Sequence, residues 1–110
     1  MQLLHLFTVA GATNDTLHTS WVPFPQDYDR CEFWVDCKMF DGSTITVALE
    51  SGMDTDEDSA QTAATSNFTA VNTDVTDVTT KLGAYVRLKF TISASAGRGV
   101  FSVWVLPKRS

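Results

Sequence analysis

The sequence predicts an all-β protein, a single-domain antiparallel β-sandwich that is jelly-roll-like and spans residues 1–110. Two stretches, residues 31–50 and 85–106, alternate apolar and polar side chains with the two-residue period of half-buried strands. Fifteen threonines favour pleated sheets, because a β-branched side chain packs well on a sheet and is penalised inside a helix. A chain of 110 residues is long enough for one hydrophobic core and too short for two.

The N-terminal part predicts two short strands. The first is expected over residues 3–9 and is followed by a turn at residues 11–15. It superficially resembles a signal peptide, but its first part has no Lys or Arg, so a strand is the preferred interpretation. The second strand is expected over residues 16–22 and ends at Pro23, because proline has no N–H to donate to a ladder.

Residues 31–50 predict a β-hairpin whose register follows from the side-chain pattern. Apolar side chains occupy every second position on both sides of a turn, at Phe33, Val35, Cys37, Met39, Ile45, Val47 and Leu49. A two-residue turn at Asp41-Gly42 would mix the apolar and polar faces. A three-residue loop with Gly42 at positive φ instead pairs Phe33 with Leu49 and keeps one face apolar, so this register is predicted.

The remaining chain predicts a loop followed by short strands. Residues 51–67 are polar without apolar periodicity and are expected to form the loop. Short strands are expected near 67–71 and 75–79, with a helix as the alternative that the Thr and Asp content disfavours. A turn at Gly97-Arg98-Gly99 is then expected to separate the strands over 85–92 and 100–106.

The chain is acidic, with a formal net charge of −5 and a pI near 4.7, which disfavours nucleic-acid binding because phosphates require a basic surface. All thirteen acidic residues lie within residues 1–77, and six of the eight basic residues lie within residues 78–110. Pairing of these charges within one sandwich is the simpler interpretation, and complementary contacts between subunits are the alternative. No apolar run approaches the roughly 20 residues that cross a membrane.

The cysteine and histidine residues form no recognisable disulfide or catalytic motif. Cys31 and Cys37 lie on one predicted strand about 20 Å apart, at a rise of about 3.3 Å per residue, which is too far for a disulfide. They are expected to be buried free thiols, which agrees with assembly in a reducing compartment. His5 and His18 are the only histidines and are interpreted as structural or surface residues. Because no catalytic motif occurs, neither an enzyme nor a cofactor is expected.

One acidic segment has the spacing of calcium ligands, with carboxylates at Asp54, Asp56 and Asp58. Hard oxygen ligands at alternate positions resemble the opening of an EF-hand loop. Ser59, however, stands where that loop needs a glycine, and Thr65 stands where a bidentate Glu should close the coordination sphere. No metal is therefore expected, and an irregular calcium site is the alternative to a solvated acidic loop.

Four residues are candidates for contacts with other molecules: Trp34, Trp104, Arg87 and Lys89. Trp34 has the opposite parity to Phe33, so the predicted register turns it away from the core. Trp104 likewise has the opposite parity to its apolar neighbours on the strand, Phe101, Val103 and Val105. Large exposed aromatic side chains mark interfaces or sugar-stacking platforms. The alternative is that both sheet faces are covered and the tryptophans are simply buried.

Three segments resemble a known group of proteins: DGSTITVALESGMD, the threonine-rich middle, and the ending GAYVRLKFTISASAGRGVFSVWVLPK. Together they resemble the small jelly-roll virion proteins of tailed bacteriophages, especially capsid decoration or cement proteins. The resemblance implies a protein that is assembled in the host cytoplasm and joins capsomers on the outer surface of the phage head. It also implies the major capsid protein as partner and a homo-oligomer, with a trimer favoured, and brings no catalytic residues.

The main alternative is a carbohydrate-binding β-sandwich module, with or without a calcium ion in the loop at residues 54–58. A third class, a small hydrolase or isomerase of cupin-like fold, requires a metal cluster of His and Glu. Two scattered histidines do not furnish such a cluster, so this class ranks last.

Overall fold

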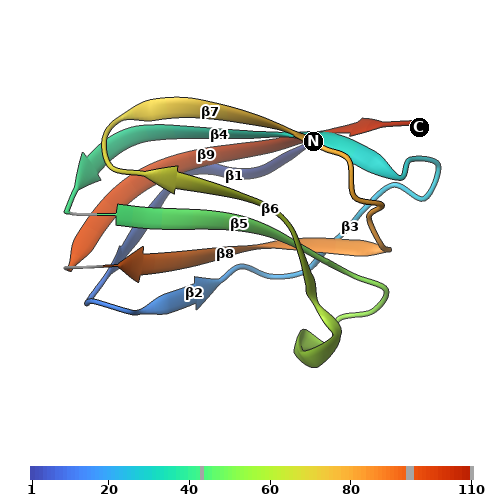
Figure 1. Ribbon diagram of the computed structural model, residues 1–110, viewed down its shortest axis with the longest axis horizontal. Helices are drawn as coiled ribbons and strands as arrows, with labels where there is room; N and C mark the ends of the chain where they lie inside the picture. The colour runs from blue at the N-terminus through green and yellow to red at the C-terminus, as the bar shows by residue number, and fades with distance from the viewer. Residues whose placement is uncertain (43, 94–95, 110) are drawn as a thin grey trace.

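The computed structural model describes residues 1–42, 44–93 and 96–109, and these form two antiparallel sheets packed face to face (Figure 1). A four-stranded sheet has the order β1-β9-β4-β7, and a five-stranded sheet has the order β2-β8-β5-β6 with β3 also paired to β8. The strands are β1 (Gln2–Gly11), β2 (Thr16–His18), β3 (Val22–Pro23), β4 (Arg30–Asp41), β5 (Thr44–Gly52), β6 (Gln61–Phe68), β7 (Asn72–Val78), β8 (Tyr85–Ser93) and β9 (Gly97–Lys108). A single 3₁₀ turn, Glu57–Ser59, lies between β5 and β6 among the described residues.

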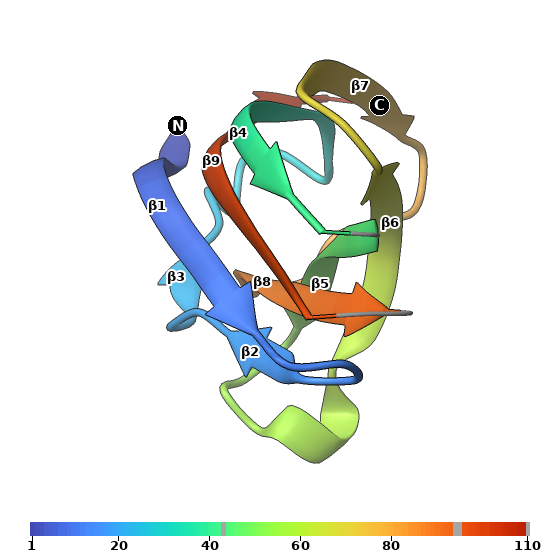
Figure 2. The same ribbon diagram turned by 90° about the vertical axis from the view of Figure 1, so that its left-hand side faces the viewer.

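The chain repeatedly crosses from one sheet to the other, which confirms the predicted all-β sandwich. β1, β4, β7 and β9 lie in one sheet, while β2, β5, β6 and β8 lie in the other. Figure 2 shows β1 and β2 on one side of the sandwich and β6 and β7 on the opposite side. Apart from the short β3, each sheet has four strands wound in this way, which is the arrangement of a jelly roll.

The core is the layer between the two sheets, filled by alternate side chains of both. The largest fully buried side chains are Phe24, Phe33, Phe68, Phe90, Phe101, Ile45, Leu49 and Leu88. Phe101 of β9 contacts Phe90 of β8 and Phe68 of β6, each with ring centroids 5.5 Å apart. Because β9 belongs to one sheet and β6 and β8 to the other, this aromatic cluster fixes the sheets against each other.

The predicted hairpin over residues 31–50 is wrong, because β4 and β5 belong to different sheets. Phe33 lies opposite Val105 of β9, and Leu49 lies opposite Leu88 of β8. The alternating pattern determines which side chains face the core, but not which strand lies alongside. Phe33 and Leu49 both reach the core, from opposite layers. Gly42 does have the expected positive φ, at 130°.

Met39 was expected in the core and is instead 43% exposed. The ladder between β4 and β9 shifts register between Cys37 and Met39, where Cys37 pairs with Phe101 and Met39 with Val100. An extra residue in one strand reverses the in–out parity of everything beyond it. The irregularity therefore turns Met39 outward.

Three further boundaries differ from expectation. The predicted loop over residues 51–67 contains most of β6, whose short Ala, Thr and Ser side chains give no apolar periodicity. The predicted second strand is divided into β2 and β3. Gly97-Arg98-Gly99 is the start of β9 rather than a turn, and a Cβ on Gly99 would lie 2.7 Å from the ring of Phe101. A glycine is needed at that position for close packing.

Candidate functional site

The outer side of the four-stranded sheet carries an apolar row. Trp34 of β4 lies directly opposite Trp104 of β9 and opposite Val75 of β7. Trp34 is 36% exposed, Val75 is 45% exposed, and Leu106, two residues beyond Trp104 on β9, is 42% exposed. These four residues, Trp34, Val75, Trp104 and Leu106, are called the tryptophan face below. Trp104 itself is half-buried.

Charged and polar side chains surround the tryptophan face. The Trp34 indole N–H donates to Glu32 Oε1 at 3.2 Å. Lys108 Nζ donates to Asp77 Oδ1 at 2.7 Å and lies 3.9 Å from Glu32, and the hydrogen bond that it donates to Asp77 raises the pKa of Lys108. On the other side, Asp36 accepts the Thr73 hydroxyl at 3.0 Å. An apolar centre with a polar rim is the usual composition of a protein interface.

The other two contact candidates lie on β8, in the opposite sheet. Arg87 is only 6% exposed, and its Nε donates to Glu50 Oε1 at 2.8 Å. Its guanidinium also lies 4.6 Å from the ring centre of Trp21. Arg87 is therefore buried within its own chain, which corrects the expectation of a contact surface, while Lys89 stays partly exposed. The structure does not bring these two residues together with Trp34 and Trp104.

Ion pairs within the chain join the acidic and basic parts of the sequence. Arg87 pairs with Glu50, and Lys108 pairs with Asp77. His18 Nε2 lies 3.9 Å from the same Glu50 carboxylate, and His5 Nδ1 lies 3.3 Å from the Gln2 amide nitrogen. Pairing within one sandwich, the simpler of the two interpretations, thus operates for these charges.

The acidic loop uses its carboxylates to bind its own backbone. Asp54 Oδ1 accepts the Asp56 N–H at 2.9 Å and the Ser59 hydroxyl at 3.2 Å, and Asp56 Oδ1 accepts the Asp58 N–H at 3.0 Å. Within the described part of the chain, no three His, Cys, Asp or Glu side chains are gathered as metal ligands. Asp54, Asp56 and Asp58 are therefore turn residues in this structure.

Cys31 and Cys37 are both buried and unbonded to each other, as predicted. Burial raises the pKa of the Cys31 thiol to about 11, and the nearby Asp77 carboxylate adds to the effect. Burial also raises the pKa of Cys37. A thiol held in its protonated form is a poor nucleophile, so these residues serve as apolar packing groups.

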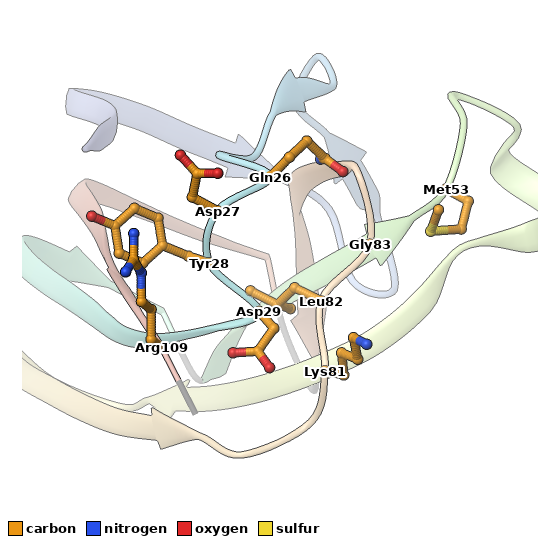
Figure 3. Close-up of a pocket in the computed structure, with 9 residues that line it drawn as sticks. All are labelled: Gln26, Asp27, Tyr28, Asp29, Met53, Lys81, Leu82, Gly83 and Arg109. Carbon is orange, nitrogen blue, oxygen red and sulfur yellow. The ribbon is translucent and has the colours of Figure 1, made fainter.

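A pocket of about 660 Å³ lies at the end of the sandwich where both termini are found (Figures 1 and 3). Its most prominent feature is the Arg109 guanidinium, 5.4 Å from the ring centre of Tyr28. Asp27, Asp29 and Lys81 contribute charges of both signs to the lining. No pattern in the sequence marks this loop-end pocket, because its lining comes from connections far apart in the chain.

Backbone hydrogen bonds hold the connections that form the loop-end pocket. The Leu82 N–H donates to the Asp29 carbonyl at 2.8 Å, and the Asp29 N–H donates to the Lys108 carbonyl at 3.3 Å. The Gly83 N–H donates to the Ser51 hydroxyl at 2.7 Å. These bonds connect the pocket walls to β5 through Ser51 and to β9 through Lys108.

Comparison with known proteins supports the fold and nothing finer. No protein family and no curated protein matches the chain. Among solved structures, the crystal structure of PirA is similar, with 8% sequence identity, a TM-score of 0.55, and coverage of 89% of this chain and 92% of that one. In the residues that the structure describes, no helix is long and apolar enough to cross a membrane. The similarity to PirA is one of all-β sandwich architecture.

Proposed function

We propose that the protein is a non-enzymatic virion structural protein, a capsid decoration or cement protein that stabilises a phage head through contacts of the tryptophan face. The observation that carries the proposal is the exposed Trp34 beside Trp104 and Val75, inside a rim of charged pairs. Buried aromatic anchors contribute most of the binding energy in protein interfaces, and polar rims exclude water around them. The sequence resemblance implies the major capsid protein as the partner.

The mechanism is stabilisation by mass action. A protein that binds only the mature arrangement of capsid subunits stabilises that arrangement relative to the expanded or disrupted shell. The contact needs no moving part, because the face is built on paired strands of a rigid sheet. Removing the Trp34 side chain is expected to weaken binding by about 2 kcal/mol or more, the usual effect at an aromatic hot spot.

The proposal also implies an assembly pathway. The chain would fold in the reducing host cytoplasm, where the buried Cys31 and Cys37 remain thiols. It would then associate as a homo-oligomer, with a trimer favoured, and bind the outer surface of the head. Contacts of the tryptophan face are proposed both between copies and with the capsid.

Co-sedimentation with phage heads that were assembled without the protein tests the proposal. Wild-type protein is expected to pellet with the heads in saturable amounts. Trp34→Ala is expected to lose at least tenfold in affinity, whereas Met53→Ala, which removes an exposed apolar side chain at the loop end, should bind normally. Absence of wild-type binding, or full binding by Trp34→Ala, would overturn the assignment.

Carbohydrate binding is the second candidate, and the loop-end pocket favours it. Tyr28 offers an exposed aromatic ring, and Asp27 is an exposed carboxylate in the same pocket that could accept sugar hydroxyl hydrogen bonds. A glycan array is the direct measurement. Binding that is lost in Tyr28→Ala and kept in Trp34→Ala would favour this module over the virion protein. Thermal melting with and without calcium would show whether the loop at residues 54–58 takes part.

A further inference from the structure

A second cavity, of about 400 Å³, opens between the two sheets on the side where β1 and β2 lie (Figure 2). Apolar side chains from both sheets form its walls: Leu3, Leu4, Phe7, Leu17 and Val22. Four polar residues complete the lining: His18, Thr19, Ser20 and Arg87. This inter-sheet cleft is separate from the tryptophan face, so its role is independent of the proposed function.

Irregular backbone in β1 shapes the wall of the cleft. The ladder between β1 and β9 shifts register around Leu4 and Phe7, and Leu6 between them has a φ of 46°, which non-glycine residues rarely adopt. The Leu6 N–H donates to the Ser102 hydroxyl at 3.0 Å. In a regular strand Leu3 and Leu4 would point to opposite faces, yet both line the cleft. Such bulges and strained residues gather at functional sites.

Contacts with Glu50 and Trp21 fix the position of Arg87 at the polar end of the cleft. Arg87 is more than nine-tenths buried, with Glu50 bonded to its Nε at 2.8 Å and the Trp21 ring 4.6 Å from its guanidinium. These contacts fix the orientation of a cationic group that also lines the cleft. Burying a charged pair is costly, so the presence of Arg87 in the lining of a mostly apolar cavity points to a use beyond stability.

The lining at this end offers hydrogen-bond donors to a carboxylate. Arg87 and His18 line the cleft, and the Glu50 carboxylate, which lies outside the lining, accepts a hydrogen bond from Arg87 Nε at 2.8 Å and lies 3.9 Å from His18 Nε2. Thr19 Oγ1 accepts the Leu88 N–H at 2.9 Å, a bond that leaves its hydroxyl proton to be donated elsewhere. A guanidinium serves several acceptors at once and binds carboxylates in a planar, bidentate manner.

We propose that the inter-sheet cleft binds a small amphipathic carboxylate. Its aliphatic chain would lie against Leu3, Leu4 and Phe7, and its carboxylate would meet Arg87 and His18. The cavity volume and the composition, mostly apolar with a few convergent polar groups, are those of a small-molecule site. The walls would exclude water from the aliphatic chain of the ligand, and the guanidinium of Arg87 would select the carboxylate by hydrogen bonding.

Titration with three probes of equal chain length tests the proposal: decanoate, decanol and decyltrimethylammonium. Decanoate is expected to bind with one-to-one stoichiometry in calorimetry and to shift the NMR signals of Phe7, Leu17 and His18. Decanol should bind at least tenfold more weakly and the cationic amphiphile weaker still. Equal binding of all three probes, no decanoate binding, or shifts confined to the tryptophan face would overturn it.

Variants of cleft residues separate binding from folding. Leu4→Trp fills the cleft and should abolish decanoate binding, and His18→Gln should weaken it about fivefold by removing the imidazole from the polar end. Lys89→Gln removes a cation outside the cleft on the same strand as Arg87 and should leave binding unchanged. Melting curves show whether each variant folds. Wild-type affinity in a folded Leu4→Trp variant would place the ligand elsewhere.

Discussion

The pair formed by Arg87 and Glu50 is the least expected residue-level feature, because both charges are almost fully buried. Arg87→Met leaves the Glu50 carboxylate buried without its partner, which is expected to lower the free energy of unfolding by about 3 kcal/mol. Urea denaturation measures this loss. Replacing both residues, as Arg87→Met with Glu50→Leu, should recover most of it, since the buried charge is then gone. A loss below about 0.5 kcal/mol in the single variant would show that the pair is exposed in solution.

Ionisation of the Cys31 thiol is expected to lower the stability of the protein at alkaline pH. Its folded pKa of about 11 lies above the ordinary value of 9.0, so the folded state favours the protonated thiol. The stabilisation that it contributes is complete below pH 9 and is lost as the pH rises toward 11. Urea denaturation at about pH 8 and about pH 10 should therefore show a larger loss for the wild type than for Cys31→Val. Identical losses of stability in the two proteins would mean that the Cys31 thiol ionises as easily in the folded state as in the unfolded state.

Single residues also show where sequence patterns stop being informative. Phe33 and Val35 were correctly assigned to the core, because alternation reports directly on which side of a strand is buried. Met39 was assigned wrongly, since a register shift leaves no mark in the hydrophobic pattern. Arg87 has the parity of an outward residue, and its burial depends on Glu50 and Trp21, which come from distant parts of the chain.

At the scale of elements, the pairing of β4 is the main departure from expectation. Antiparallel pairing of β4 with β9 and β7 predicts backbone NOEs between Trp34 and Trp104 and between Trp34 and Val75. NMR on labelled protein measures them. The hairpin alternative predicts NOEs between Phe33 and Leu49 on adjacent strands instead. Observing these, without the contacts to β9, would contradict the strand order.

The connection from β4 toward β5 depends on Gly42. Its φ is 130°, and a Cβ there would lie 2.6 Å from the Gly97 Cα at the start of β9. Gly42→Ala is therefore expected to lower the free energy of unfolding by about 1–3 kcal/mol, through strain and a backbone clash. Thermal or urea unfolding measures the change. Gly83→Ala is not a suitable control, because a Cβ there would lie 2.6 Å from the Gly52 carbonyl oxygen; Ala12→Gly, in an exposed turn, is preferable.

At the scale of the whole molecule, the fold class could be predicted from the sequence, but the order of the strands in the sheets could not. Alternation and threonine content are local properties, and they indicated a β-sandwich. Strand order depends on pairings between distant segments, such as Gln2 with Trp104, and the sequence carries no local signal for them. The same limit explains the loop-end pocket and the inter-sheet cleft, whose residues become neighbours only after the sheets have packed.

The solution mass of the protein, measured by light scattering on a sizing column, tests the contact role of the tryptophan face most directly. The wild type is expected to form a closed oligomer, with a trimer at three times the chain mass of 12.1 kDa favoured. Trp34→Ala should shift the mass toward one chain, while Met53→Ala should keep the oligomer. A wild-type protein that remains monomeric as its concentration is raised, or a Trp34→Ala variant that keeps the full oligomer, would contradict this account.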